Sequence, residues 1–342
     1  MARDESEPKV EGLATETPAT TTALSVPPVF MFGFERSGTT MLSMMMGAHP
    51  DLAVPFSATG LWYRYADRLE MYGALAAAND VERMVDELLR EERIGLWDAE
   101  LDRNAILDGL ELGSYAAVVA RFHAAYAAAK GKPHWGNIDI ATLYHMDQVN
   151  RWFPDARFIH IVRDCRDVAL SHKTYAYGAS NVLECAELWK HDIHANLMAG
   201  SMLDEHRYLV VRYEDLVLDC ENTLRRLCRF AGLAFAPEMM AYHETVSERI
   251  PESRRWLWPD ITRAPVAGNV YRWRNTMPAA DQAIVSGVAG ELLDQFGYEP
   301  TGKAKKSLWP FLKELWYFAG RGHRFNRLLV KFGLRSRRNR RK

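Results

Sequence analysis

VFMFGFERSGTTMLSMMMGAHPDLAVP, residues 29–55, carries the clearest structural signal in this chain. Its first five residues are apolar, as is typical of a buried strand. A glycine-containing turn follows, and the Met-rich pattern from Thr39 onward predicts a helix that ends at His49-Pro50. A strand, a turn and a helix in this order leave unpaired N–H groups at the start of the helix. The stretch therefore predicts an anion-binding loop at the end of a buried strand.

The residue types in this turn indicate which class of anion it could bind. A nucleoside triphosphate-binding P-loop carries Lys-Ser/Thr after its second glycine, to reach the β- and γ-phosphates and Mg²⁺. Here Thr39 takes the lysine position, and the only cation of the turn, Arg36, precedes Ser37-Gly38. The hydroxyls of Ser37, Thr39 and Thr40 add hydrogen-bond donors. The pattern favours a fixed cation beside a smaller leaving group over a triphosphate with its metal; the alternative is a strand–helix turn without a ligand.

A second candidate site begins at Arg163, in the stretch IHIVRDCRDVALSHKTY. Arg163 ends a strand-like run, and ligands of open α/β sheets bind where strands end. Ser171 follows eight residues later, about two helical turns into the next element. Arg163 and Ser171 could hold a second phosphate, whereas Asp164, Arg166 and Asp167 are expected to form a cap or to pair locally.

The remaining pattern predicts one α/β domain with a P-loop-like central parallel sheet flanked by helices. Strand-like runs occur at residues 29–33, 157–162 and 208–211, and a helical pattern follows each one. The segment 247–276 has no clean period and is expected to be a long, partly irregular loop. Helices are expected at 81–89, 114–130, 142–152, 167–177, 181–205, 221–231 and 279–295.

Composition indicates three regions. Residues 1–25 are acidic and rich in Thr, Ala and Pro, without the apolar core of a secretory signal, and are interpreted as a disordered leader. Residues 26–300 have the character of a globular domain, and residues 301–342 form a basic tail that also contains aromatic residues. No apolar run approaches the roughly 18 residues of a membrane span. Four scattered cysteines fit reduced thiols, and we expect a cytoplasmic protein.

The charge of the tail is the second unusual feature. Residues 321–342 hold ten of the 43 Lys and Arg residues and no Asp or Glu, so an acidic body carries a strongly basic end. Aromatic and aliphatic residues precede or interleave with these charges. Such a segment can lie on an anionic membrane, here the inner face; a solvated, partly helical tail is the alternative. Nucleic-acid binding is not expected, because the body is acidic and no nucleic-acid fold signature occurs.

Four segments together resemble the 3′-phosphoadenylyl sulfate (PAPS)-dependent sulfotransferases, in particular the bacterial and tyrosylprotein-sulfotransferase-like branch. They are FGFERSGTT…AHPD, FPDARFIHIVRDCRDVALS, VVRYEDLVLD and, more loosely, YRWRNTM…LLDQFGY. The resemblance implies that PAPS is a co-substrate and that no metal is needed, which would explain the missing lysine. It implies that the cofactor contacts are Arg36, Ser37, Gly38, Thr39 and Thr40 for the 5′-phosphosulfate, Arg163 and Ser171 for the 3′-phosphate, Tyr213 on the adenine side and Arg272 as a late basic contact.

The acceptor half departs from the family pattern. The catalytic glutamate of the tyrosylprotein branch falls on Ser57, a lysine of many bacterial relatives falls on Ile138, and a further arginine falls on Tyr175. Another group must then accept the proton, or the acceptor must itself be acidic. Asp139, in the segment where relatives place acceptor-side groups, is the first candidate for a general base, and His134 is the second, because an imidazole titrates near neutral pH. An ordinary capping or surface role is the alternative for both.

The sequence thus predicts transfer of a sulfuryl group from PAPS to a hydroxyl of a small-molecule, glycan or lipid acceptor, with Arg36 stabilising the charge of the leaving phosphate. Two other functions stay open. A P-loop kinase-like phosphotransferase would require ATP and Mg²⁺. A PAPS-binding protein without catalysis would fit the departures at Ser57 and Ile138.

Overall fold

The computed structural model of the 342-residue chain describes residues 26–56, 60–173, 179–250 and 267–299, together with residues 252, 262 and 264. The leader, the basic tail and the positions Ser57 and Tyr175 lie outside these residues.

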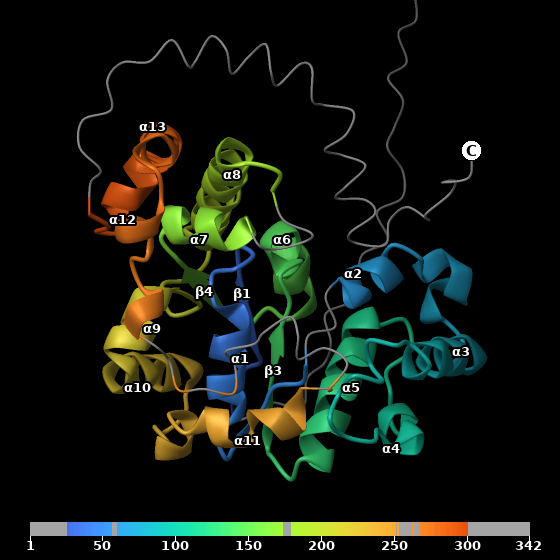
Figure 1. The fold of residues 1–342 in the computed structure, drawn as a ribbon. Coiled ribbons are helices and arrows are strands. Elements are labelled where there is room, and N and C mark those ends of the chain that lie inside the picture. Colours follow the sequence, from blue (N-terminus) through green and yellow to red (C-terminus); the bar gives the residue numbers. More distant parts are fainter. Residues whose placement is uncertain are drawn as a thin grey trace, which may run out of the picture.

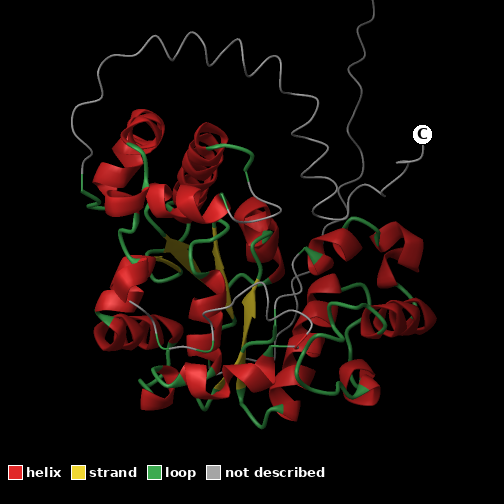
Figure 2. Ribbon diagram, viewed as in Figure 1, coloured by secondary structure: helices red, strands yellow, loops and turns green. Residues whose placement is uncertain are grey.

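The centre of the molecule is a five-stranded sheet in the order β2-β3-β1-β4-β5, and every neighbouring pair is parallel. The strands lie between helices in Figures 1 and 2. Their bounds are β1 Val29–Gly33, β2 Leu52–Ala53, β3 His134–Ile138, β4 Arg157–Val162 and β5 Tyr208–Arg212. The prediction of an α/β fold with a P-loop-like parallel sheet is confirmed.

The order of the strands creates a point where ligands are expected. After β1 the chain goes to β2 and β3 on one side, and it then crosses β1 to form β4 and β5 on the other. The strands β1 and β4 are in register from Val29–Arg157 to Gly33–Ile161, so they end at the same level. In open α/β sheets, the crevice between two such strands at their carboxyl ends is the usual binding place.

Helices surround the sheet. The helix α1 packs against β1, β2 and β3 and lies in front of the sheet in Figure 1, while α5 contacts β3 and α6 contacts β1. The helices α7, α8 and α13 pack on one another. The α-helices are α1 Thr39–Gly47, α2 Leu61–Ala66, α3 Ala78–Leu89, α4 Arg103–Leu107, α5 Tyr115–Ala129, α6 Thr142–Trp152, α7 Cys165–His172, α8 Val182–Gly200, α9 Tyr213–Leu218, α10 Cys220–Ala231, α11 Tyr242–Arg249, α12 Trp273–Thr276 and α13 Ala279–Gln295; the 3₁₀ helices are η1 Leu69–Leu75, η2 Pro237–Met239 and η4 Ala267–Asn269.

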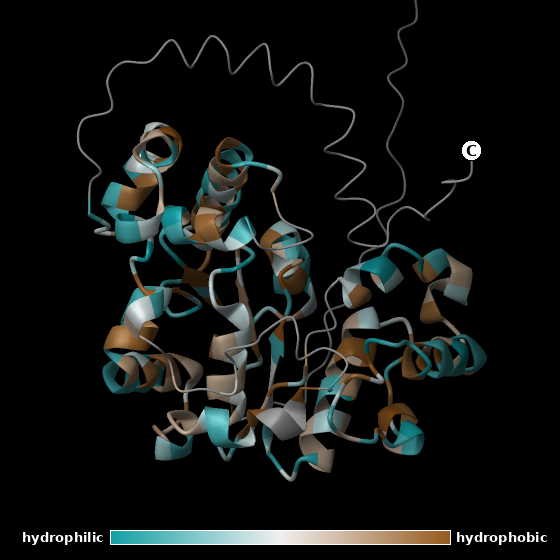
Figure 3. Cartoon of the chain, in the orientation of Figure 1, coloured by the Kyte–Doolittle hydropathy of each residue, from teal (hydrophilic) through white to brown (hydrophobic). Residues whose placement is uncertain are grey.

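The apolar pattern of the sequence explains what is buried. All five residues of β1 are buried, as a central parallel strand covered on both faces requires. The surrounding helices carry hydrophobic residues beside hydrophilic ones, as Figure 3 shows for α8 and α13. Each helix in the described part of the chain is either too short or too polar to span a bilayer.

Most predicted elements occur, and two strands were missed. The helices predicted at 142–152 and 279–295 have those bounds as α6 and α13, and the three predicted strands appear as β1, β4 and β5. The strand β3 has the sequence HWGNI, and it was missed because its His, Gly and Asn interrupt the run of apolar residues that predicts a strand. The strand β2 is only two residues long. The segment predicted as an irregular loop contains the end of α11 and the short η4 and α12, and part of it lies outside the described residues.

Candidate functional site

The loop between β1 and α1 has an unusual backbone. Arg36 has a φ of 66° and Gly38 a φ of 95°, so both lie in the left-handed region. This conformation costs a non-glycine residue roughly 1–2 kcal/mol, and such residues cluster at functional sites. The N–H of Ser37 donates to the carbonyl of Phe34 at 3.1 Å, which tightens the turn. The strained backbone conformation of Arg36 thus lies in the loop where an anion site is predicted.

The start of α1 is open to a negatively charged ligand. Gly38 precedes the first residue of α1, and no side chain of the described residues caps this end of the helix. Ser37 is fully buried, yet its Oγ has no hydrogen-bond partner among the described residues. Thr39 and Thr40 begin the helix. A buried hydroxyl without a partner is costly, and helix N–H groups favour anions, so this end of α1 fits a phosphate-like group.

Arg163 joins the ends of β1 and β4. Its Nη1 donates to the carbonyl of Arg36 at 3.1 Å, and its Nη2 donates to the carbonyl of Asn269 at 3.0 Å. The indole N–H of Trp189 in turn donates to the carbonyl of Arg163 at 3.1 Å. The second predicted arginine thus lies directly beside the loop that holds the first.

Ser171 is brought to the same place from α7. The Nε of Arg36 donates to the Oγ of Ser171 at 2.9 Å. Burial and, to a smaller extent, the nearby Arg36 guanidinium lower the pKa of His172 to about 4. At neutral pH, His172 is therefore uncharged. Of the side chains described so far beside the loop, the guanidinium groups of Arg36 and Arg163 therefore carry the positive charge.

Tyr213, at the start of α9, packs between the two candidate sites. The guanidinium of Arg163 lies 4.3 Å from the centre of its ring. On the loop side, a Cβ added at Gly38 would lie 2.4 Å from the Cδ2 of Tyr213. Only glycine fits this position, because its φ is positive and the ring leaves no room for a side chain. The ring therefore fixes how closely the loop and Arg163 approach each other.

Arg272 is exposed and directly precedes α12. Its neighbours hold the segment against the end of β4: the carbonyl of Asn269 accepts from Arg163, and the N–H of Trp273 donates to the Oδ1 of Asp167 at 2.9 Å. The structure thus brings the segment of Arg272 to the same edge of the sheet as the other predicted cofactor residues. Asn269 was missed by the sequence reading, because it contributes a backbone carbonyl, for which side-chain patterns carry no signal.

Asp139 directly follows β3 and lies at the same edge of the sheet as the loop. Its carboxylate is fully buried and accepts the N–H groups of Gly60 at 2.8 Å and Ala141 at 2.9 Å. Burial raises the pKa of Asp139 to about 6, although these two N–H groups and the charge of Arg93 lower it. A pKa in this range suits a general base, whereas the two bonds to backbone N–H groups fit the capping alternative. The role of base stays a prediction.

His134 does not lie near the loop. It is the first residue of β3, two positions before Gly136, which pairs with the first residue of β1. The loop follows the last residue of β1, so the strand geometry separates it from His134 by roughly 20 Å. The prediction of His134 as a base does not fit this placement, because a base must reach its proton at hydrogen-bond distance.

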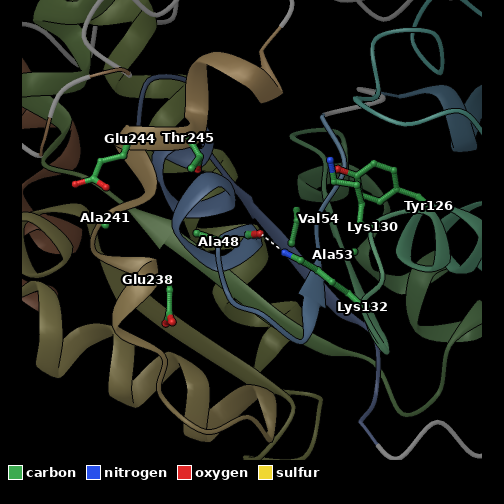
Figure 4. Close-up of a pocket in the computed structure, with 11 residues that line it drawn as sticks. Ala48, Ala53, Val54, Tyr126, Lys130, Lys132, Glu238, Ala241, Glu244 and Thr245 are labelled. Carbon is green, nitrogen blue, oxygen red and sulfur yellow. Dashed lines mark hydrogen bonds between the residues drawn. The ribbon is translucent and has the colours of Figure 1, made fainter.

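A pocket of about 360 Å³ lies near the other end of α1 (Figure 4). It is lined by the end of α1, by β2 and by residues of α11, and the Nζ of Lys132 donates to the carbonyls of Gly47 and His49 at 2.7 and 2.9 Å. None of the predicted site residues lines this pocket. Among the described residues, no group of three or more His, Cys, Asp or Glu side chains could hold a metal ion.

Comparison with known proteins identifies the family. The model of the sulfotransferase family matches residues 27–237, which is more than half of the chain. The chain belongs to this family. The matched residues include the loop at Arg36 as well as Arg163, Ser171 and Tyr213.

Individual sulfotransferases are distant in sequence. A protein-tyrosine sulfotransferase of Drosophila melanogaster is 25% identical over 80% of this chain and 52% of its own length. The protein-tyrosine sulfotransferase 2 of Gallus gallus is 25% identical over 65% of this chain and 56% of its own length. The chain therefore spans about half the length of these two relatives. The sulfotransferase domain of the Synechococcus PCC 7002 olefin synthase shares the fold, with a TM-score of 0.56 and 20% identity over 84% of this chain and 97% of that domain.

Proposed function

We propose that this protein transfers a sulfuryl group from PAPS to an acceptor hydroxyl. The observation that carries the proposal is the joint between the ends of β1 and β4, where Arg163 bonds the carbonyl of Arg36 and Arg36 bonds Ser171. This joint places two fixed cations beside the start of α1, which no described side chain caps, and beside the hydroxyl of Ser37, which has no hydrogen-bond partner among the described residues. Such a site suits a ligand with two separate anionic groups, as the family membership leads us to expect.

The chemistry needs few groups from the protein. The acceptor oxygen forms a bond to sulfur while the bond from sulfur to the oxygen of the 5′-phosphate breaks, so adenosine 3′,5′-bisphosphate leaves with the bonding electron pair. As in phosphoryl transfer, positioning and charge stabilisation dominate. Arg36, the N–H groups at the start of α1 and the hydroxyl of Ser37 would stabilise the leaving phosphate. The acceptor proton would go to a base, for which Asp139 is the candidate of this chain.

The acceptor class is a separate part of the proposal. We retain the hydroxyls of small molecules, glycans and lipids, and the names of the two curated relatives add protein tyrosine to the acceptors worth testing. We also propose a cytoplasmic location, with residues 301–342 in contact with an anionic membrane; the composition of that segment supports this.

The experiment uses the full-length protein, ³⁵S-labelled PAPS and panels of acceptors: a metabolite extract, a lipid extract, glycans and tyrosine peptides. We expect label on at least one acceptor without added Mg²⁺ or ATP. In Arg36→Ala, transfer should fall by about 10²–10³-fold. Thermal unfolding should stay close to that of wild type, since one partly exposed side chain is lost.

Each result has a separate meaning. Nucleotide binding without labelling of any acceptor would favour a PAPS-binding protein without catalysis. Phosphate transfer from ATP that depends on Mg²⁺ would favour a phosphotransferase. Near-normal transfer by Arg36→Ala would remove this loop from the mechanism.

A further inference from the structure

Behind the candidate site lies a group of buried polar side chains that no proposed step uses. The carboxylate of Asp164 and the guanidinium of Arg166 form two hydrogen bonds, of 2.8 and 2.7 Å, and neither side chain has any exposed surface. A buried ion pair of this kind is often no more stable than apolar residues of the same size, because both charges lose their hydration. Stability alone is thus a weak explanation for the pair.

Glu214 of α9 connects this pair to two other parts of the chain. Its Oε1 accepts the backbone N–H of Asp164 at 3.0 Å, and its Oε2 accepts the hydroxyl of Tyr298 at 2.8 Å. Glu214 is itself buried. We call Asp164, Arg166, Asp167, Glu214 and Tyr298 the buried frame. The frame joins the end of β4, the start of α9 and the end of the described chain.

The buried frame also holds the segment of Arg272. The guanidinium of Arg166 lies 3.7 Å from the ring centre of Trp273, and Asp167 accepts the N–H of the same residue. The Nη1 of Arg166 donates to the carbonyl of Glu299 at 2.8 Å. Trp273 is thus fixed by two members of the frame, one at its ring and one at its backbone.

Three predicted cofactor residues are direct sequence neighbours of residues that belong to the buried frame or contact it. Asp164 directly follows Arg163, and Glu214 directly follows Tyr213. In the same way Trp273, which contacts Arg166 and donates to Asp167, directly follows Arg272. At each of these three places, one residue faces the buried frame and its neighbour belongs to the predicted nucleotide site. On the outer side, the guanidinium of Arg163 stacks on the ring of Tyr213 at 4.3 Å.

We propose that Asp164, Arg166 and Glu214 are positioning residues, which set the places of Arg163, Tyr213 and Arg272 and thereby the preference for a nucleotide with a 3′-phosphate. This inference rests on the proposed function. Side chains of a binding site need support from a second layer of contacts to hold their geometry. The buried frame supplies that layer for three segments that lie far apart in sequence.

The test compares two nucleotides that differ only in the 3′-phosphate. Isothermal titration calorimetry measures the Kd values of adenosine 3′,5′-bisphosphate and adenosine 5′-phosphate for the full-length protein and its variants. Glu214→Ala should bind the bisphosphate about tenfold more weakly, the equivalent of one lost hydrogen bond, and its affinity for the monophosphate should change less. Glu214→Gln keeps the shape and an acceptor for the N–H of Asp164, so it should restore the preference to within about twofold.

Two further variants complete the design. Tyr298→Phe removes only the hydroxyl on Glu214 and keeps the ring, which packs 4.5 Å from the guanidinium of Arg212. It should lower the preference by a few-fold, and it decides the question alone if Glu214→Ala does not fold. Leu227→Ala, in the buried face of α10, is the control for lost stability and should leave the preference unchanged.

The outcomes separate this inference from the function on which it rests. An unchanged preference in Tyr298→Phe and in folded Glu214→Ala would overturn the positioning role and leave the buried frame as a structural feature only. A shift of the same size in Leu227→Ala would also overturn it. A wild-type protein that fails to prefer the bisphosphate would instead contradict the proposed function.

Discussion

Replacement of Glu214 by Gln measures how much the titration of one buried carboxyl group changes the stability of this protein. Burial raises the pKa of Glu214 from 4.5 to about 7, against the hydrogen bonds from Asp164 and Tyr298, which lower it. The folded protein therefore keeps a proton on Glu214 at pH values where the unfolded chain has lost it. The stability of the wild-type protein should fall as the pH rises between these two pKa values.

The size of the effect follows from the shift. Each unit of pKa difference corresponds to about 1.4 kcal/mol, so this group should lower the free energy of unfolding by about 3 kcal/mol between pH 4.5 and pH 7, with little further change above pH 7. Glutamine has a similar shape and does not titrate. The stability of Glu214→Gln relative to wild type should rise by the same amount over this range.

The assay is urea unfolding, followed by tryptophan fluorescence, for both proteins from about pH 5 to about pH 8. The difference between the two proteins isolates Glu214, because other titrating groups such as Asp139 are present in both. Glu221→Gln is the matched control: this glutamate of α10 is half exposed and pairs with Arg225 at 2.7 Å. Its difference from wild type should stay small at every pH. If the difference between Glu214→Gln and wild type stays constant over the whole range, Glu214 is charged in the folded state and the reasoning fails.

Three further predictions concern the candidate site and the tail. Arg163→Ala should abolish most of the preference of the protein for adenosine 3′,5′-bisphosphate over adenosine 5′-phosphate in calorimetry; equal Kd ratios in variant and wild type would contradict the assignment. Asp139→Asn should reduce transfer at saturating PAPS by about 10²–10⁴-fold if Asp139 is the base, whereas His134→Ala should keep near-normal transfer because of its distance from the loop. Removal of residues 308–342 should weaken binding to anionic vesicles, and added salt should weaken the binding of the full-length protein; equal partitioning of both proteins would leave the tail merely solvated.

The sequence alone determined much of the fold and where the candidate nucleotide site was expected. The apolar run of β1, the turn after it and the helical periods are local signals, and local signals can be read from spacing. A local cap or pair was also expected for Asp164 and Arg166, and the structure shows both: Asp164 caps the start of α7 and bonds the side chain of Arg166. Arg36, Arg163, Ser171 and Tyr213, which the resemblance assigns to the nucleotide, lie together in the structure, and their contacts with PAPS stay a prediction.

Only the tertiary structure decided which residues meet across the sheet. Asp139 and His134 are five residues apart in the sequence, yet the strand between them places one at the loop edge and the other at the opposite edge. Glu214 meets Asp164 and Tyr298 over separations of 50 and 84 residues. Such contacts depend on strand order and on the packing of helices, and no pattern along the chain encodes them. A residue of ordinary appearance in the sequence, Glu214, thus becomes a buried link between three segments of the proposed nucleotide site.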